Sequence, residues 1–258
     1  EDYLRILRFF RFFAWYGRGR PDADGIRACA RLKGGLARLS AERVWAELKK
    51  LLSAPDPSRA LLWMRQASVL TAVVPESEKW GIDAIHGLVG AERDLGWPPD
   101  PMLRLAAIVP PDEARMADLA ARLRLSKVEA ARLTAWAATP PLHHATGEAA
   151  FRKIAYRGDR GGIGTRLRLA LASARVRAAD DNDALIEAAG HARLLRVLEE
   201  WEQPVFPLKG GDLTALGYEP GKELGDLLSR LENDWVDSGF AATREALLER
   251  AAGELKPT

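Results

Sequence analysis

The sequence predicts an all-α protein, an elongated multi-helix array of about 12 to 14 helices. Apolar residues recur at spacings of three and four along most of the 258-residue chain, which is the period of an amphipathic helix. Alanine and leucine dominate, and no six-residue window alternates β-branched with polar side chains as a half-buried strand does. Proline, glycine and capping residues interrupt the pattern often, so we expect short helices joined by tight turns.

Local signals place the individual helices. Ser40 is an expected N-cap, and Ser126 to Glu129 spell a capping box. Asp56-Pro57 and Asp100-Pro101 each combine an N-cap with proline at the first helical position. Glycines and proline pairs mark the breaks between the apolar runs. The predicted helices cover residues 1–16, 24–33, 40–54, 57–68, 77–95, 101–109, 112–124, 127–138, 147–157, 163–179, 183–202, 211–216, 222–237 and 241–252.

The first predicted helix carries an unusual stripe of charge. At about 100° per residue, Glu1, Arg5 and Arg8 fall on one narrow face, with Asp2 at its edge. Nearly every other residue up to Trp15 is apolar. Buried or half-buried charges are costly unless they are paired or used. A Glu1–Arg5 ion pair with acidic residues at the helix start would satisfy this requirement, and so would a binding site.

Three motifs resemble one enzyme family. Glu1-Asp2-x-x-Arg5-x-x-Arg8, followed by Phe-Arg-Phe, resembles the nucleotide-selecting motif of bacterial CCA-adding enzymes (tRNA nucleotidyltransferases) and the related bacterial poly(A) polymerases. Residues 39–48, Leu-Ser-Ala-Glu-Arg-Val-Trp-Ala-Glu-Leu, are similar to the stretch that follows in that family. Residues 206–225 are similar to the C-terminal tail of the same enzymes. Residues 75–200 resemble the family only in their length and in their helical sequence pattern.

The resemblance implies a role for each residue of the first motif. A carboxylate beside a guanidinium accepts a hydrogen bond from an amino group and donates one to a ring nitrogen, as the edges of cytosine and adenine require. Asp2 and Arg5 would form this base-reading pair, Glu1 would hold Arg5, and Arg8 would lie near the nucleotide or pair with Glu1. Arg43 and Glu47, spaced as an i, i+4 ion pair, would brace this nucleotide-selecting helix.

The family's catalytic head is expected to lie outside this chain. In the family, a Gly-Gly-x-x-Arg-Asp stretch and an Asp-x-Asp metal pair precede the nucleotide-selecting motif, where this chain begins. We therefore expect a fragment without catalytic or metal-binding residues of its own, whose whole enzyme uses Mg²⁺ held by the head. Asp22-Ala23-Asp24 and Asp181-Asn182-Asp183 also spell Asp-x-Asp, but each is typical of a turn with an N-cap.

A basic segment and a tail turn are the candidate RNA-binding elements. Between residues 152 and 177, Asp159 is the one acidic residue, and an Arg-rich helix pair with few acids is typical of RNA binding. A solvated surface whose arginines pair with acids elsewhere remains the alternative. Lys209 and Lys222 flank a Gly/Pro turn where phosphate could dock, or whose glycines only cap helices. The basic residues are Arg152, Lys153, Arg157, Arg160, Arg166, Arg168, Arg175 and Arg177.

Composition is that of a globular chain, with a net charge of +2 and one cysteine, which excludes an internal disulfide. No apolar run approaches the ~20 residues of a membrane span, so we expect a cytoplasmic protein. Residues 1–75 would form a neck, 76–140 a body, and 141–258 a tRNA-binding tail. The expected function is the nucleotide-selecting and tRNA-binding part of an enzyme that adds C and A, from CTP and ATP, to tRNA 3′ ends. A poly(A) polymerase, an A-only enzyme and a non-catalytic RNA-binding module remain open, as does the oligomeric state.

Overall fold

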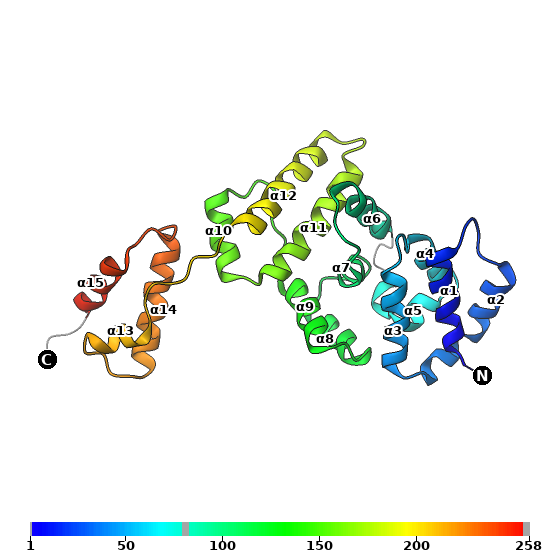
Figure 1. The fold of residues 1–258 in the computed structure, drawn as a ribbon, viewed down its shortest axis with the longest axis horizontal. Helices are drawn as coiled ribbons and strands as arrows, with labels where there is room; N and C mark the ends of the chain where they lie inside the picture. The colour runs from blue at the N-terminus through cyan, green and yellow to red at the C-terminus, as the bar shows by residue number, and fades with distance from the viewer. Residues whose placement is uncertain (1, 79–82, 255–258) are drawn as a thin grey trace. The chain divides into compact units, whose positions relative to one another are not determined.

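The protein was analysed as a computed structural model that describes residues 2–78 and 83–254 (Figure 1). These residues contain no strand, which confirms the all-α prediction. Regular structure in this part of the chain consists of α-helices and two short 3₁₀ helices. They are α1 (Leu4–Tyr16), α2 (Ala23–Leu32), η1 (Lys33–Arg38), α3 (Ala41–Leu52), α4 (Ser58–Gln66), α5 (Val69–Val73), η2 (Pro75–Ser77), α6 (Asp83–Leu95), α7 (Pro101–Ala107), α8 (Glu113–Arg122), α9 (Lys127–Ala138), α10 (Glu148–Arg157), α11 (Arg160–Arg177), α12 (Asn182–Glu200), α13 (Gly210–Ala215), α14 (Lys222–Asp237) and α15 (Arg244–Glu254).

The chain divides into two compact units. The first unit contains Glu1–Thr146 and Gly158–Leu198, and the second contains Gly147–Arg157 and Glu199–Thr258. The basic segment between residues 152 and 177 is therefore shared between the two units. The predicted neck, body and tail refer to functional parts of the chain, and their boundaries at residues 75 and 140 stay a prediction.

Most predicted caps are present. Asp22 accepts a hydrogen bond from the backbone N–H of Gly25, and Asp100 accepts from the N–H of Met102. The capping box between Ser126 and Glu129 is complete. Ser40 has the extended backbone of an N-cap, but its side chain does not cap the helix. These bonds satisfy N–H groups that would otherwise be unpaired in the first helical turn.

Several elements differ from the sequence prediction, including η1 and η2, which were not expected. Helix α5 was not expected, because its five residues are too few to display a helical period. Helix α11 begins at Arg160 rather than 163, so the predicted glycine-rich break is wrong for residues 161 and 162. A Cβ atom at Gly162 would lie 2.5 Å from the carbonyl oxygen of Ala135, so glycine is needed for α11 to pack closely on α9. The predicted helix at 77–95 is observed as α6 from Asp83, and residues 79–82 lie outside the described part.

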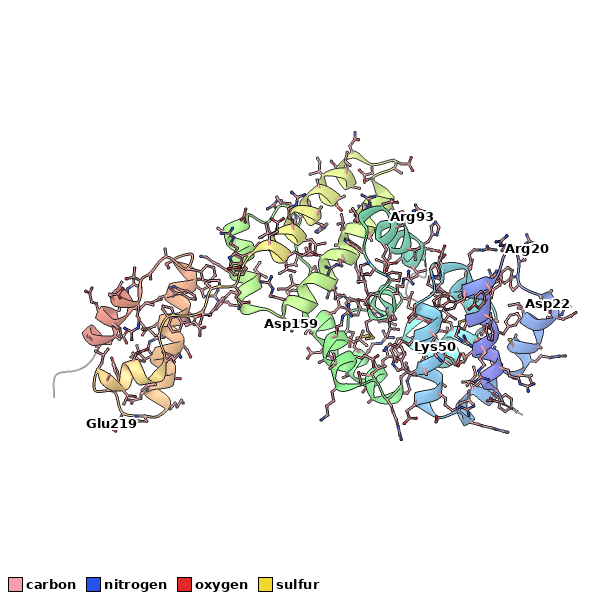
Figure 2. The ribbon with its side chains drawn as sticks, in the orientation of Figure 1. Arg20, Asp22, Lys50, Arg93, Asp159 and Glu219 are labelled. Atoms are coloured by element: carbon pink, nitrogen blue, oxygen red, sulfur yellow. The ribbon has the colours of Figure 1, made fainter. Side chains whose placement is uncertain are left out.

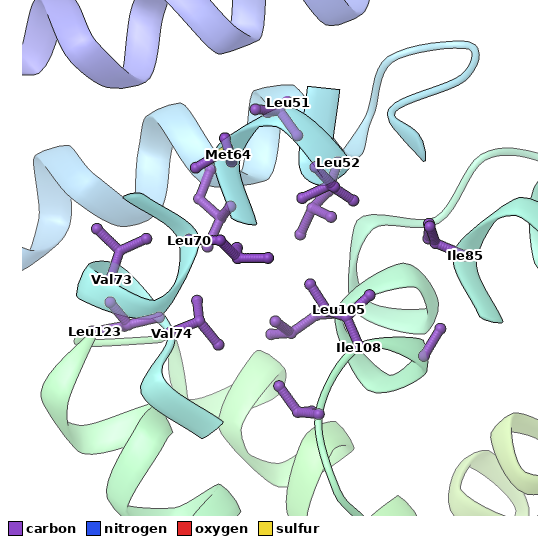
Figure 3. Close-up of a cluster of buried hydrophobic side chains, with 14 of the residues drawn as sticks. Leu51, Leu52, Met64, Leu70, Val73, Val74, Ile85, Leu105, Ile108 and Leu123 are labelled. Atoms are coloured by element: carbon purple, nitrogen blue, oxygen red, sulfur yellow. The ribbon is translucent and has the colours of Figure 1, made fainter. Parts of the chain in front are cut away.

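Each unit has its own hydrophobic core. Figure 3 shows part of the core of the first unit, where Leu51 and Leu52 of α3 lie near Met64, Leu70 and Leu105. All five side chains are buried. The core of the second unit gathers buried side chains of α13, α14 and α15 with Leu208, and it consists of Leu208, Leu213, Leu227, Leu231, Trp235, Val236, Leu247 and Ala251.

A buried ion pair fixes the end of α3. Arg104 of α7 is fully buried, and its Nη2 lies 2.7 Å from Oε2 of Glu92 on α6. The same guanidinium donates to the backbone carbonyls of Leu52 and Ala54. One side chain thus neutralises a buried carboxylate and satisfies carbonyl groups left unpaired at the C-terminal end of α3.

The buried face of α1 contacts α3 and α4. Leu4, Ile6, Leu7 and Phe10 of α1 are buried. On α3, the side chain of Glu47 is only 7% exposed, and its carboxylate accepts a hydrogen bond from Nε of Arg11 at 2.6 Å. Its other oxygen lies 3.5 Å from Nε of Arg8. Two guanidiniums of α1 are therefore held by one buried carboxylate of α3.

Arg43 and Glu47 do not pair with each other among the described contacts. Glu47 binds the two arginines of α1, and Arg43 binds Asp2. The i, i+4 spacing predicts a pair within α3, but the buried Glu47 carboxylate faces α1, where two guanidiniums compensate its charge. Both residues still contact the segment that they were expected to brace.

Replacement of Arg104 by alanine should destabilise the protein strongly. The change leaves the carboxylate of Glu92 buried without a counter-charge, so we expect a loss of about 3–5 kcal/mol in the free energy of unfolding, measured by urea titration. The double variant Glu92→Met/Arg104→Met removes both charges and should lose less than Arg104→Ala. A double variant that is less stable than the single one would contradict this account.

Replacement of Glu47 by glutamine should also reduce stability. The amide keeps the shape of the carboxylate but not the charge that holds Arg8 and Arg11, so we expect a loss of about 1–3 kcal/mol. Glu42→Gln is the matched control on the same helix, because its pair with Arg124 is exposed and should contribute less than about 1 kcal/mol. Equal losses of stability in the two variants would show that burial does not make the Glu47 ion pairs more stabilising than an exposed pair.

Candidate functional site

The N-terminal end of α1 presents the predicted base-reading residues. Oδ1 of Asp2 accepts a hydrogen bond from the N–H of Leu4 at 3.1 Å, and the backbone carbonyl of Asp2 accepts from the N–H of Arg5 at 3.1 Å. These bonds put Asp2 at the start of the first turn and Arg5 one turn further along. Residues three apart on a helix are neighbours on its surface. Asp2 precedes the N-cap Tyr3, and Arg5 lies in the first turn of α1.

Arg43 of α3 holds the carboxylate of Asp2. Its Nη2 lies 3.2 Å from Oδ1 and 3.1 Å from Oδ2 of Asp2, and both side chains are partly exposed. The hydrogen bond from Leu4 lowers the pKa of Asp2, desolvation raises it, and the positive charges of Arg43 and Arg8 lower it further. The net shift is downward, so Asp2 is an ionised acceptor at neutral pH.

Arg5 and Arg8 are both exposed on the helix. Arg8 contacts Glu47 of α3, so the structure gives it a partner other than Glu1. Glu1, which was expected to hold Arg5, lies outside the described residues. The site thus combines one ionised carboxylate with exposed guanidiniums on a rigid helix end. Such a group offers hydrogen-bond acceptors and donors side by side.

Sequence reasoning missed Arg11, which makes the shorter of the two contacts with Glu47. It falls between four phenylalanines, and only its spacing of three from Arg8 indicated a shared helical face. Arg43 was expected to contribute to support, but its direct contact with Asp2 required the tertiary structure. No signal within α3 points to a partner 41 positions earlier in the chain.

The α10 part of the basic segment belongs to the second unit and is paired there. Arg152 lies 2.5 Å from Glu148 on the same helix. Lys153 donates to the backbone carbonyl of Asp237, and Arg157 lies 3.1 Å from the carboxylate of that residue. These contacts match the alternative interpretation, in which the basic residues pair with acids and carbonyls elsewhere in the fold.

The α11 part of the basic segment belongs to the first unit, and its arginines also have partners there. Arg160 donates to the carbonyl of Leu198, and Arg166 donates to that of Thr139. Arg168 lies 5.7 Å from the centre of the Trp97 ring, and Arg175 lies 3.0 Å from Asp94. Arg177 lies 2.5 Å from the carboxylate of Glu187. Half-burial lowers the pKa of Arg166, which is consistent with a structural guanidinium. The RNA-binding role of these residues stays a prediction.

Lys209 and Lys222 begin helices of the second unit. Lys209 precedes α13, where its backbone N–H donates to Asp212 at 2.7 Å, and Lys222 is the first residue of α14. Gly217, in the turn between these helices, has a φ of 105°, which side-chain-bearing residues rarely adopt. Both lysine side chains are exposed, and neither makes an ion pair with another described residue.

The described residues do not fit a magnesium site. They contain no group of three or more His, Cys, Asp or Glu side chains placed to hold a metal ion. The two Asp-x-Asp sequences are caps and surface pairs, as expected: Asp22 caps α2, Asp24 binds Arg27, and Asp181 accepts from the N–H of Asp183. No described helix is long and apolar enough to cross a membrane.

The chain is similar in sequence to a protein family and to several known proteins. Residues 22–80 match the family described as "Probable RNA and SrmB- binding site of polymerase A". The chain is 32% identical over 259 residues to the mouse (Mus musculus) mitochondrial CCA tRNA nucleotidyltransferase 1 and 30% identical over 258 residues to the human (Homo sapiens) protein. Each match covers 96% of this chain and 54% of the relative.

A bacterial relative matches a shorter part. The multifunctional CCA protein of Vibrio vulnificus (strain YJ016) is 36% identical over 104 residues, which cover 39% of this chain and 24% of that protein. The chain spans about half the length of the vertebrate relatives, yet nearly all of it takes part in those matches. Over 96% of its residues the chain is thus similar to CCA tRNA nucleotidyltransferases, and residues 22–80 match the polymerase A family model.

Proposed function

We propose that this chain is the nucleotide-selecting and tRNA-binding part of a CCA-adding tRNA nucleotidyltransferase. The observation that carries the proposal is the match to CCA tRNA nucleotidyltransferases over 96% of the chain. It is supported by an ionised Asp2 and an exposed Arg5 at the N-terminal end of α1. The whole enzyme would add C, C and A to the 3′ ends of tRNA in the cytoplasm, without a nucleic-acid template.

Asp2 and Arg5 would choose the nucleotide by hydrogen bonding. An ionised carboxylate has about four acceptor positions, of which the contacts from Leu4 and Arg43 use three. One acceptor position would remain for the amino group of cytosine or adenine, and Arg5 would donate to the adjacent ring nitrogen. Guanine and uracil present these groups in the reverse order and would leave both side chains unsatisfied. Arg43 would keep the carboxylate ionised and correctly oriented.

The whole enzyme would join the nucleotide to tRNA by phosphoryl transfer. The terminal tRNA hydroxyl would attack the α-phosphorus of CTP or ATP, forming a new phosphodiester bond and releasing pyrophosphate. Magnesium, where bound, neutralises phosphate charge in reactions of this type. The described residues of this chain do not form a site for it, so their proposed roles are recognition and positioning.

Lys209 and Lys222 are the proposed phosphate contacts in the second unit. Their ammonium groups are exposed beside helix N-termini, where backbone N–H groups attract anions. Recognition of tRNA by shape and phosphates, rather than by base sequence, would suit a protein that acts on many tRNAs. A poly(A) polymerase is the second candidate, favoured by the family description matched at residues 22–80.

Asp2→Ala and Arg5→Ala in the full-length protein should relax nucleotide selection. Each change removes one half of the base-reading pair, so we expect the preference for CTP and ATP over UTP and GTP to fall by about tenfold or more, the effect of one lost hydrogen bond to a charged group. Relative incorporation of the four nucleotides gives the ratio. Asp24→Ala is the control, because that carboxylate binds only Arg27 at the surface of α2. Unchanged ratios in both site variants would refute the assigned roles.

Lys209→Gln and Lys222→Gln should weaken tRNA binding at every tRNA sequence. If each lysine contacts one phosphate, the slope of log K against log salt should fall by about 0.7–0.9 for each substitution. Filter binding at several salt concentrations gives the slope. Lys127→Gln, at the exposed start of α9, is the matched control and should leave the slope unchanged. A slope that the tail substitutions do not alter would exclude these contacts.

A further inference from the structure

The C-terminal end of α1 exposes three aromatic rings. Phe12 is 50% exposed, Trp15 42% and Tyr16 74%. The ring centres of Phe12 and Tyr16 are 6.3 Å apart, and those of Trp15 and Tyr16 are 6.5 Å apart. Isolated exposed aromatic residues are common, but a contiguous group on a rigid helix more often marks an interaction surface.

The rings are fixed in their exposed positions. The indole Nε1 of Trp15 donates to the backbone carbonyl of Lys50 at 2.8 Å, which orients the ring beside the end of α3. The guanidinium carbon of Arg11 lies 4.2 Å from the centre of the Phe12 ring. Gly17 then ends α1 with an extended backbone conformation, and a Cβ atom there would lie 2.2 Å from the ring of Phe13. The surface is therefore preorganised, which lowers the entropy cost of binding.

Three cations lie close to these rings, either along the chain after Tyr16 or at the residue whose carbonyl binds Trp15. Arg18 and Arg20 lie on the loop between α1 and α2, and Lys50 lies near the end of α3 (Figure 2). All three are exposed, and none forms an ion pair with any residue in the described part of the chain. Along the chain the acid nearest to Arg18 and Arg20 is Asp22, whose carboxylate caps α2. The acid nearest to Lys50 is Glu47, which binds Arg8 and Arg11. We call Phe12, Trp15, Tyr16, Arg18, Arg20 and Lys50 the α1 patch.

A hollow of about 200 Å³ adjoins the α1 patch. Phe13, Trp15 and Gly17 of the α1 end line it together with Asp56 and Arg59. Arg59 lies over the Phe13 ring at 5.6 Å. Oδ1 of Asp56 already accepts from the N–H and the hydroxyl of Ser58, which leaves Oδ2 as the acceptor. The hollow therefore combines aromatic walls with one donor group and one acceptor group, which are the features that a planar, polar ring can use.

We propose that the α1 patch binds unpaired nucleotides of a single-stranded RNA segment. Exposed aromatic rings stack on bases of any sequence, and cations follow the phosphates between them. Unpaired bases can stack in this way, whereas paired bases inside a duplex cannot. Three unpaired cations favour a polyanion over an apolar protein surface, since burial of these charges against a protein without acids would be costly.

This contact is distinct from the base-reading pair. Helix α1 rises about 1.5 Å per residue, so Phe12 and Tyr16 lie about 10 Å and about 17 Å along the helix axis from Arg5. The inference rests on the proposed RNA-binding function, but it concerns residues to which that function assigns no role. The patch and the base-reading pair can therefore be tested separately.

The stacking arm of the test uses fluorescence anisotropy with a labelled 12-nucleotide oligouridine and the full chain. Tyr16→Ala should weaken binding by about fivefold or more, the lower end of the effect of one lost stacking ring. Tyr16→Phe keeps the ring and should bind as the unchanged protein does. Val128→Ala, at another exposed apolar residue, is the surface control and should have no effect. Equal affinity of Tyr16→Ala and the unchanged protein would overturn the proposal.

The charge arm uses Arg18→Gln and Arg20→Gln. Each should lower the slope of log K against log salt by about 0.7, the value for one phosphate contact in a single strand. Arg115→Gln, an exposed arginine of α8, should leave the slope unchanged. Tighter binding to a blunt duplex of equal length would overturn the proposal. Loss of self-association in Tyr16→Ala, with unchanged RNA binding, would identify a protein interface and also overturn it.

A comparison with Asp2→Ala separates this inference from the proposed function. That variant should bind oligouridine normally even where its nucleotide selection is altered. Normal selection in Tyr16→Ala with reduced oligouridine binding supports the patch alone. Altered selection in Asp2→Ala with normal binding by Tyr16→Ala supports the base-reading pair and rejects the patch.

Discussion

The position of α1 depends on one buried carboxylate. Glu47 of α3 compensates Arg8 and Arg11, so the charged stripe of α1 is fastened to its neighbour by ion pairs and by the apolar face beneath. Helix α3 is in turn fixed at its far end by Arg104, which binds the last carbonyl of α3 (Leu52), the carbonyl of Ala54 just beyond it, and Glu92 of α6. Buried ion pairs thus hold the far end of α3 in the interior of the first unit and hold α1 on α3. The surface where Asp2 and Arg5 lie depends on both. Preorganisation of this kind is what a site that discriminates by hydrogen bonding requires.

Local interactions were predictable from the sequence, and tertiary ones were not. The caps at Asp22, Asp100 and Ser126 follow from residue type and position, because a cap bonds to N–H groups only two or three residues away. The five-residue α5 gave no periodic signal. Arg43 shows the limit for the candidate site: helical spacing offers Glu47 as its partner, while the fold provides Asp2. Which of two carboxylates it binds is decided by the packing of α1 on α3.

The basic segment between residues 152 and 177 shows a different limit of prediction from sequence. A count of arginines between residues 152 and 177 reveals an excess of charge, but it cannot reveal the backbone carbonyls that accept from those arginines. Arg160 and Arg166 bind carbonyls, and Arg175 binds an acid 81 residues away. Exposed cations without an ion pair to another described residue occur instead at Lys209, Lys222 and the end of α1. Charge that is free to meet a phosphate therefore has to be identified from the structure.

Gly162 has an effect beyond its own position. The absence of a side chain there lets the first turn of α11 approach the last turn of α9, where the carbonyls of α9 lack partners within their own helix. At that separation Arg166, one turn later, reaches the carbonyl of Thr139 and sits over the ring of Trp136. The absence of a side chain at one position thus sets the spacing of two helices. This spacing determines whether the guanidinium of Arg166 can bind the carbonyl groups left unpaired at the C-terminal end of α9.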